Sequence, residues 1–226
     1  MNATFGSILV VAAHPDDETL GCGGSLARFA AAGAVVRVLI LGEGLTARLG
    51  PTPAEAIEEL RHDCRAACAV LGAAAPEFHA FPDNRFDTVP LLDIVKTVEA
   101  ACDASRAELI LTHHHGDLNI DHVITHRAVL TATRPSVARR IPQVWAFETP
   151  SATEWAFGLA PFAPDTFVDI GATLEAKVRA MACYRSESCP PPHPRATASL
   201  RALATVRGAA SGCLAAEAFM AVRNLI

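Results

Sequence analysis

The chain has 226 residues, of which 51% are hydrophobic, and its formal net charge at pH 7 is −5. This length suits one α/β domain with a sizeable core, so we expect a single domain over residues 1–226. The 19 Lys and Arg residues form no basic run, which argues against a nucleic-acid partner, and no apolar run reaches the about 20 residues that stable membrane insertion requires.

Polar side chains follow the first predicted strand, Ser7–Val11, in the sequence AHPDDE at residues 13–18. A strand that ends in such a cluster typically delivers polar groups to the edge of a sheet. Imidazole and carboxylate groups suit Zn²⁺, so His14 and Asp17 are candidate metal ligands. Pro15 fits the first position of a helix, which would turn Asp16 and Asp17 in different directions. A plain helix cap is the alternative, but it would leave most of the cluster without a role.

The next predicted elements form a βαβ unit. A helix over Ser25–Ala32 ends at Gly33, and the strand Ala34–Leu41 follows it, so the two strands should be parallel and the crossover right-handed. The glycines within residues 21–24 do not complete a dinucleotide-binding motif, because Leu26 stands where the third glycine belongs. We expect them to let the helix lie close to the sheet, or to let the backbone approach the site.

The loop 42–48 leaves this second strand at the same sheet edge as AHPDDE, and we expect it to wall the pocket. Its Arg48 is a candidate donor to substrate hydroxyls or to a phosphate. The residues Thr52–Glu55 predict a capping box with Pro53 at the first helical position, and Gly72 ends the helix that follows.

Two more strands are predicted at Glu77–Phe81 and Leu109–Thr112, with an amphipathic helix over Pro90–Asp103 between them. The turn Pro82–Arg85 falls just past the end of the first of these strands. Its composition is ordinary for a loop, but its place at the functional edge makes Asp83 a candidate contact for substrate hydroxyls.

A second dense cluster, HHHGDLNIDH at residues 113–122, follows the fourth strand. Because the carboxyl ends of parallel strands meet at one edge of an open sheet, His122 can supply a third metal ligand. His126 shares a helical face with His122 but lies in an apolar stripe, so we interpret it as a core residue. Asp117 and Asp121 are expected to orient imidazoles. Their spacing also opens a calcium-binding loop, but histidine and alanine stand where that loop requires glycine and glutamate.

The last third of the chain is less regular. Strands are predicted at Gln143–Glu148 and Thr166–Ile170. The tail, Ala196–Ile226, is predicted to be mostly helical, with breaks at Gly208 and Gly212.

A proline-rich segment, Pro190–Pro194, precedes this tail. Consecutive prolines forbid a helix and favour a stiff, extended loop. Its His193 either lines the site, as part of a lid or as an acid, or lies on an inert surface loop.

These motifs resemble the zinc-dependent PIG-L/LmbE-like deacetylase family, whose members hydrolyse N-acetyl groups, chiefly from amino sugars. AHPDDE and the Asp-His pair at 121–122 carry the resemblance most specifically. The turn at 82–85 and the late segments at 193–195, 207–208 and 216–219 extend it over nearly the whole chain. The expected fold is a Rossmann-like three-layer α/β/α sandwich with a mostly parallel sheet and the site at the carboxyl ends of the strands.

The resemblance implies that His14, Asp17 and His122 bind zinc and that Asp16 is the general base. Many members carry a histidine three residues before the last ligand, where this chain has Asn119. An amide can hydrogen-bond an oxyanion but cannot deliver a proton. The general acid is therefore open between Asp16 itself and another histidine. The histidines considered for that role are His115 and His193.

We therefore expect a cytoplasmic, metal-dependent hydrolase that removes an N-acetyl group from a small amino sugar or amino-sugar conjugate. The alternatives are a hydrolase of another amide or ester and a non-catalytic sugar-binding protein. Fe²⁺ accepts the same ligand set as Zn²⁺. The candidate substrate contacts are Arg48, Asp83 and Arg85. The seven cysteines indicate buried thiols in a reducing compartment, and the apolar surplus is compatible with a homo-oligomer.

Overall fold

The computed structural model describes residues 5–47, 50, 52–135 and 140–225. Seven strands form one sheet in the order β3-β2-β1-β4-β5-β7-β6. Every strand pair is parallel except the two that involve β7, which runs antiparallel between β5 and β6. The strands are β1 (Ser7–Ala12), β2 (Val35–Gly42), β3 (Glu77–Phe81), β4 (Leu109–His113), β5 (Gln143–Phe147), β6 (Thr166–Asp169) and β7 (Ala216–Asn224).

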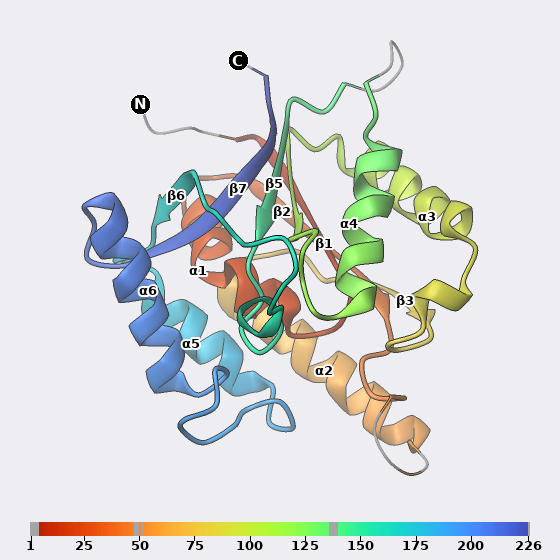
Figure 1. Cartoon of the computed structure of the whole chain (residues 1–226), viewed down its shortest axis with the longest axis horizontal. Helices are drawn as coiled ribbons and strands as arrows, with labels where there is room; N and C mark the ends of the chain where they lie inside the picture. The colour runs from red at the N-terminus through yellow and green to blue at the C-terminus, as the bar shows by residue number, and fades with distance from the viewer. Residues whose placement is uncertain (1–4, 48–49, 51, 136–139, 226) are drawn as a thin grey trace.

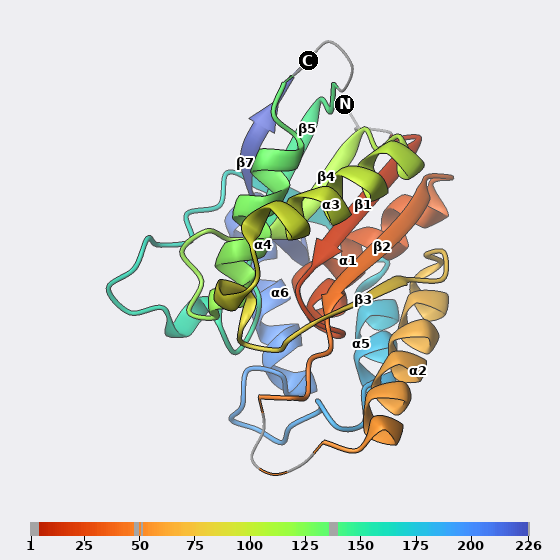
Figure 2. The same ribbon diagram turned by 90° about the vertical axis from the view of Figure 1, so that its right-hand side faces the viewer.

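Helices cover both faces of this sheet, so the predicted three-layer α/β/α sandwich is confirmed (Figures 1 and 2). Four helices lie on one face and two, α3 and α4, on the other. No helix of the described part of the chain is long and apolar enough to cross a membrane. The helices are α1 (Asp17–Ala31), α2 (Ala54–Leu71), α3 (Leu91–Ser105), α4 (Ile120–Ala132), α5 (Leu174–Cys183) and α6 (Thr197–Ser211), with short 3₁₀ turns η1 (Phe86–Thr88) and η2 (Thr153–Trp155).

The central strand β1 has a core on each side. Ile8 and Val10 point into the core beneath α1, and Leu9 and Val11 point into the core beneath α3 and α4. A strand buried on both faces is apolar on both faces, which is why β1 is an unbroken apolar run from Ile8 to Ala12. The sheet thus holds β1 rigidly, and the polar residues that follow it start from a fixed point.

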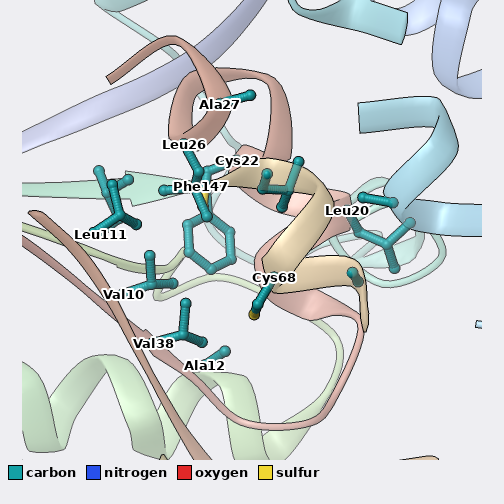
Figure 3. Packing of buried hydrophobic residues seen from close by; sticks show 14 of the residues in the cluster. Val10, Ala12, Leu20, Cys22, Leu26, Ala27, Val38, Cys68, Leu111 and Phe147 are labelled. Atoms are coloured by element: carbon teal, nitrogen blue, oxygen red, sulfur yellow. The ribbon is translucent and has the colours of Figure 1, made fainter. Parts of the chain in front are cut away.

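Helix α1 lies unusually close to the sheet because of its glycines. A Cβ atom on Gly21 would lie 2.2 Å from the ring of Phe147 on β5, and one on Gly24 would lie 2.8 Å from Ile170. Figure 3 shows the Phe147 ring packed among Val10, Leu111 and other side chains at this contact. The expectation that these glycines permit a close helix–sheet approach is confirmed.

Two predicted helix starts are wrong. Helix α1 begins at Asp17 rather than at Ser25, and Asp16, not Pro15, stands at its boundary. The helix continues through the glycines because the sheet contact favours it, although Cys22 departs from helical geometry. The predicted capping box is also absent at α2, because the Thr52 hydroxyl donates to the Leu45 carbonyl oxygen (3.3 Å) and Pro53 lies just before the first turn.

The predicted helical tail is correct only as far as Ser211. Gly212 ends α6 with a φ of 79°, and the chain then returns through the sheet as β7. Alanine favours a helix by intrinsic propensity, but here pairing with both β5 and β6 outweighs it. Gly208 does not break the helix. It lies inside α6, where a Cβ would come within 2.8 Å of the Ala215 backbone.

Candidate active site

The two polar clusters meet at the carboxyl edge of the sheet. From the central strands β1 and β4 the chain continues in opposite directions along the sheet, and such a switch point leaves a crevice for ligands. A cavity of about 480 Å³ occupies it. Its lining residues are His14, Pro15, Asp16, Asp17, Gly44, Ala47, Asp83, Asn84, Leu118, Asn119, His122, Ser151, Ala152, Trp155, Glu187 and Arg195.

The three predicted metal ligands lie together in this cavity. Potential ligand atoms of His14, Asp17 and His122 are all within 4.8 Å of one another, and all three residues are buried. Asp17 Oδ2 lies 3.6 Å from His14 Nδ1 and 3.4 Å from His122 Nε2. Two imidazoles and one carboxylate form a donor set suited to Zn²⁺ or Fe²⁺.

Carboxylates also face the far nitrogens of both imidazoles. His14 Nε2 lies 2.9 Å from Asp121 Oδ2 and 3.2 Å from Asp83 Oδ1, while His122 Nδ1 lies 3.2 Å from Asp117 Oδ1. A histidine that binds a metal usually needs such an acceptor to fix its tautomer and orientation. The predicted orienting role of Asp117 and Asp121 agrees with this geometry, and the residues present fit a divalent ion.

Two other groups of potential ligands occur in the described residues. One joins His14 to Asp83 and Asp121, and the other consists of Glu18, Cys64 and Cys68. The second group is fully buried and does not line the cavity, and Glu18 Oε1 already accepts hydrogen bonds from Tyr184 and Thr19.

Charges in the cluster favour a cation between the carboxylates. Burial alone would lower the pKa of His122, but the adjacent Asp17 and Asp117 carboxylates raise it to about 9. Burial would raise the pKa of Asp17, yet His122 and His113 hold it well below its usual range. The His122 imidazole thus supplies positive charge where a bound metal ion would supply it instead.

A third imidazole at the site, His113, was not predicted to have a role. Its ring stacks on His122 with centroids 3.9 Å apart, and burial lowers its pKa well below the usual value. His113 Nε2 accepts a hydrogen bond from the Ala13 backbone N–H (2.9 Å), so it acts as a neutral support. His126 Nδ1 lies 2.7 Å from the His113 carbonyl oxygen, which agrees with its interpretation as a core residue.

Asp16 has a strained backbone and a charged partner. Its φ is 108°, and its N–H donates to Glu18 Oε2 (3.1 Å). Burial raises its pKa well above the usual range, and Arg195 opposes this rise. Arg195 Nη1 donates to Asp16 Oδ2 (2.6 Å) and Glu187 Oε2 (2.9 Å), and Arg195 Nε donates to Ser151 Oγ (2.7 Å). Such positive-φ residues are concentrated at functional sites.

A buried ion pair supports the helical turn that carries Asp17. Helix α1 is interrupted at Cys22, which leaves carbonyl and N–H groups unpaired on either side. Lys177 Nζ, from α5, donates to the Leu20 carbonyl oxygen (2.7 Å) and to Glu217 Oε1 (2.6 Å). The Glu217 carboxylate, from β7, accepts from the N–H groups of Gly24 and Ser25. One ion pair therefore satisfies both sides of the interruption.

The other predicted site residues divide into two groups. Asp83 and Asn119 line the cavity, and Asn119 Oδ1 also caps α4 by accepting from the Asp121 N–H (2.9 Å). In contrast, His115 and Arg85 are exposed and do not line it. Arg48 lies outside the described residues.

The proline-rich loop reaches the cavity through a residue other than the predicted one. His193 is half-buried and does not line the cavity, although its Nδ1 accepts a hydrogen bond from the Arg195 N–H (3.2 Å). Arg195 is the lining residue. The resemblance includes the segment His193-Pro194-Arg195, but the sequence predicts a site role only for its histidine, because imidazole is a common general acid near neutral pH.

The fold and site together define a class: an α/β protein whose switch point carries a buried His–Asp cluster fitted to a divalent metal ion. A model of the PIG-L family, described as GlcNAc-PI de-N-acetylase, matches residues 9–133, which is more than half of the chain. The chain belongs to the PIG-L family.

Two individual relatives with similar sequences are named as deacetylases, and a solved structure has a similar fold. The chain is 32% identical over 149 residues to the uncharacterized deacetylase YaiS of Escherichia coli, covering 64% of this chain and 74% of YaiS. It is 28% identical over 228 residues to 1D-myo-inositol 2-acetamido-2-deoxy-alpha-D-glucopyranoside deacetylase of a Mycobacterium species, covering 80% and 73%. The structure of GalB, the 4-carboxy-2-hydroxymuconate hydratase of Pseudomonas putida KT2440, superposes with a TM-score of 0.78 at 23% identity over 97% of both chains. This last likeness shows the fold alone.

Proposed function

We propose that this protein is a metal-dependent N-deacetylase that hydrolyses the N-acetyl group of an amino sugar or amino-sugar conjugate. The observation that carries the proposal is the position of Asp16 beside the His14, Asp17 and His122 cluster in one cavity. Membership of the PIG-L family supports this reaction over the hydrolysis of other amides or esters.

His14, Asp17 and His122 would hold the ion, Zn²⁺ or Fe²⁺, with the outer carboxylates fixing both imidazoles. Such an ion supplies a Lewis acid that lowers the pKa of water from about 16 towards about 7. Because Asp17 and Asp16 are consecutive and serve different partners, one carboxylate can bind metal while the other handles protons.

Asp16 is the general base in this proposal. It takes the proton of the attacking water as oxygen adds to the acetyl carbonyl carbon. The Arg195 guanidinium at 2.6 Å fixes the carboxylate and offsets the cost of burying its charge. The raised pKa of Asp16 brings it closer to neutral pH, where a base and acid are most effective.

Asp16 also returns the proton to the leaving amine. Of the three residues considered as the acid, Asp16 lines the cavity, while His115 and His193 do not. Asn119 Oδ1 is engaged by the start of α4, so its amide presents the Nδ2 donor as a partner for the developing oxyanion. Acetate and a free amine are the products.

Asp83 is the proposed contact for sugar hydroxyls. Its carboxylate lines the cavity and accepts hydrogen bonds from the Ala47 N–H (3.1 Å) and Asn84 Nδ2 (3.0 Å). A carboxylate held in this way can accept a hydrogen bond from a sugar hydroxyl without moving. Arg48, one residue beyond Ala47, and Arg85 stay proposed contacts on the grounds of sequence alone.

The proposal is tested by acetate release from N-acetylglucosamine and its conjugates. Protein stripped of metal should release no acetate, and adding Zn²⁺ or Fe²⁺ should restore release. Acetate itself must be quantified, because a hydratase shares this fold. Tight metal binding without acetate from any N-acetylated sugar would overturn the deacetylase assignment.

A further inference from the structure

The mouth of the cavity is apolar on one side. Two lining residues, Leu118 and Trp155, keep 54% and 40% of their surface exposed. Leu118 belongs to the loop between β4 and α4, and Trp155 ends η2. Both line the same cavity as His14 and His122. A ligand seated over the metal cluster would therefore meet apolar side chains where it leaves the cavity.

Three further exposed hydrophobic residues, Ile120, Phe157 and Leu159, follow these two lining residues closely in the sequence. We call Leu118, Ile120, Trp155, Phe157 and Leu159 the apolar mouth. These are five of the twelve large hydrophobic residues that are exposed within the described ranges, and Phe157 is 87% exposed. Exposed apolar surface is unfavourable in water, and its concentration beside a cavity marks a binding surface.

Hydrogen bonds hold the two segments together. Thr153 Oγ1 donates to Asp117 Oδ2 (2.6 Å), and His114 Nε2 lies 2.9 Å from the Ala160 carbonyl oxygen. At Gly116 the segments approach so closely that a Cβ would lie 2.2 Å from that same oxygen. The apolar mouth is thus preorganised, which reduces the entropic cost of binding a ligand there.

The charges of the described residues that line the cavity disfavour an anionic ligand group at this position. Arg195 is the one Lys or Arg among the described lining residues. Its guanidinium already contacts the carboxylates of Asp16 and Glu187. A phosphate would therefore find no cation of its own among these residues, and it would lie near carboxylates such as Asp83.

We propose that the apolar mouth binds an apolar aglycone, so that the substrate is an N-acetylated amino sugar with an alkyl or aryl group at its anomeric carbon. Leu118 and Trp155 line the same cavity as the candidate metal ligands. A sugar bound at these ligands would therefore place its aglycone against the two apolar side chains. This inference rests on the proposed deacetylase function.

Kinetics with two glycosides test the proposal. The ratio of kcat/KM for hexyl over methyl N-acetyl-β-glucosaminide should be at least about tenfold, the gain from burying roughly two methylene groups. Trp155→Ser and Leu118→Ser should each lower that ratio towards one. Leu214→Ser is the matched control, since Leu214 is 91% exposed and does not line the cavity, and it should keep the wild-type ratio. A wild-type ratio near one would overturn the proposal.

A binding measurement separates this proposal from the deacetylase assignment. Hexyl β-glucoside has no acetyl group, so its binding does not depend on the reaction. It should shift tryptophan emission to the blue by covering Trp155, whereas methyl glucoside should not, and Trp155→Phe should abolish the shift. Trp145 is 7% exposed and should contribute little. No shift with hexyl glucoside would overturn the apolar subsite, whatever the acetate assays show.

A second copy of the chain is the competing occupant. If the apolar mouth were a subunit interface, sedimentation would show an oligomer that Phe157→Ser dissociates, and this result would overturn the proposal. An unchanged mass for Phe157→Ser, together with the hexyl preference, would support it.

Discussion

The first and second parts of the chain contribute different things to the site. Residues 9–133 carry Asp16 and all three candidate metal ligands, in the loops that follow β1 and β4 and in the first turns of α1 and α4. Residues 140–225 supply the groups that hold α1 and the Asp16 residue before it, across sequence separations of 157 to 193 residues. The candidate catalytic and metal-binding residues thus come from the first part of the chain, while residues far away in the sequence hold them in position. Substitutions in the first part should abolish metal binding or catalysis, and those in the second should disturb stability and alignment.

The largest effect is expected from removing a candidate ligand. His122→Gln should abolish activity and weaken Zn²⁺ binding by more than the about 10–100-fold that loss of an outer partner costs. Zinc content after dialysis against a weak chelator measures this directly. His62→Gln is the control, because the His62 side chain is 76% exposed on α2. A His122→Gln protein with full zinc content would show that the cluster is not the metal site.

Asp16→Asn should separate chemistry from metal binding. The amide cannot accept the proton of water, so kcat should fall by about 10²–10⁴-fold while zinc content is unchanged. Steady-state acetate release by the zinc-loaded protein is the measurement. Asp87→Asn changes an exposed carboxylate of η1 in the same way and should leave kcat intact. Undiminished turnover by Asp16→Asn would refute the base assignment.

A substitution in the second part should act on stability. Lys177→Met leaves the buried Glu217 carboxylate without its cation, and such losses cost about 3–5 kcal/mol. Urea unfolding followed by circular dichroism measures the free energy of unfolding. Lys96→Met, at an exposed position of α3, should change it by less than about 0.5 kcal/mol. Equal effects of the two substitutions would mean that the ion pair does not support α1.

The smallest of these effects is expected at Arg195. Hydrogen bonds to charged groups contribute about 1.5–3 kcal/mol, so Arg195→Met should lower kcat/KM by roughly 10–100-fold without loss of zinc. Arg201→Met, which breaks the exposed pair with Glu175, serves as the control in the same acetate assay. If Arg195→Met lost zinc as His122→Gln should, the two parts of the chain would not have separate roles.

The sequence predicts the first part of the molecule well. The strands β1 and β4 are buried apolar runs followed by polar clusters, so the apolar pattern and the rule for parallel sheets predict that the two clusters lie at one edge of the sheet. The orienting role of Asp117 and Asp121 can also be predicted, because a metal-bound histidine usually donates its other N–H to a carboxylate.

The contacts and elements of the second part could not be predicted in the same way. The pairing of Lys177 with Glu217 and of Arg195 with Asp16 depends on how α5, β7 and the proline-rich loop pack, and no local pattern records this. The alanine-rich β7 is misread as helix for the same reason, because its neighbours in the sheet outweigh its propensity. Tertiary contacts, rather than local signals, decide this part of the chain.

Anomalous diffraction at the zinc edge, from crystals grown with Zn²⁺, tests the account most directly. We predict a peak about 2.0–2.2 Å from ligand atoms of His14, Asp17 and His122. A peak among Glu18, Cys64 and Cys68 instead, or no peak with zinc present in excess, would contradict the account.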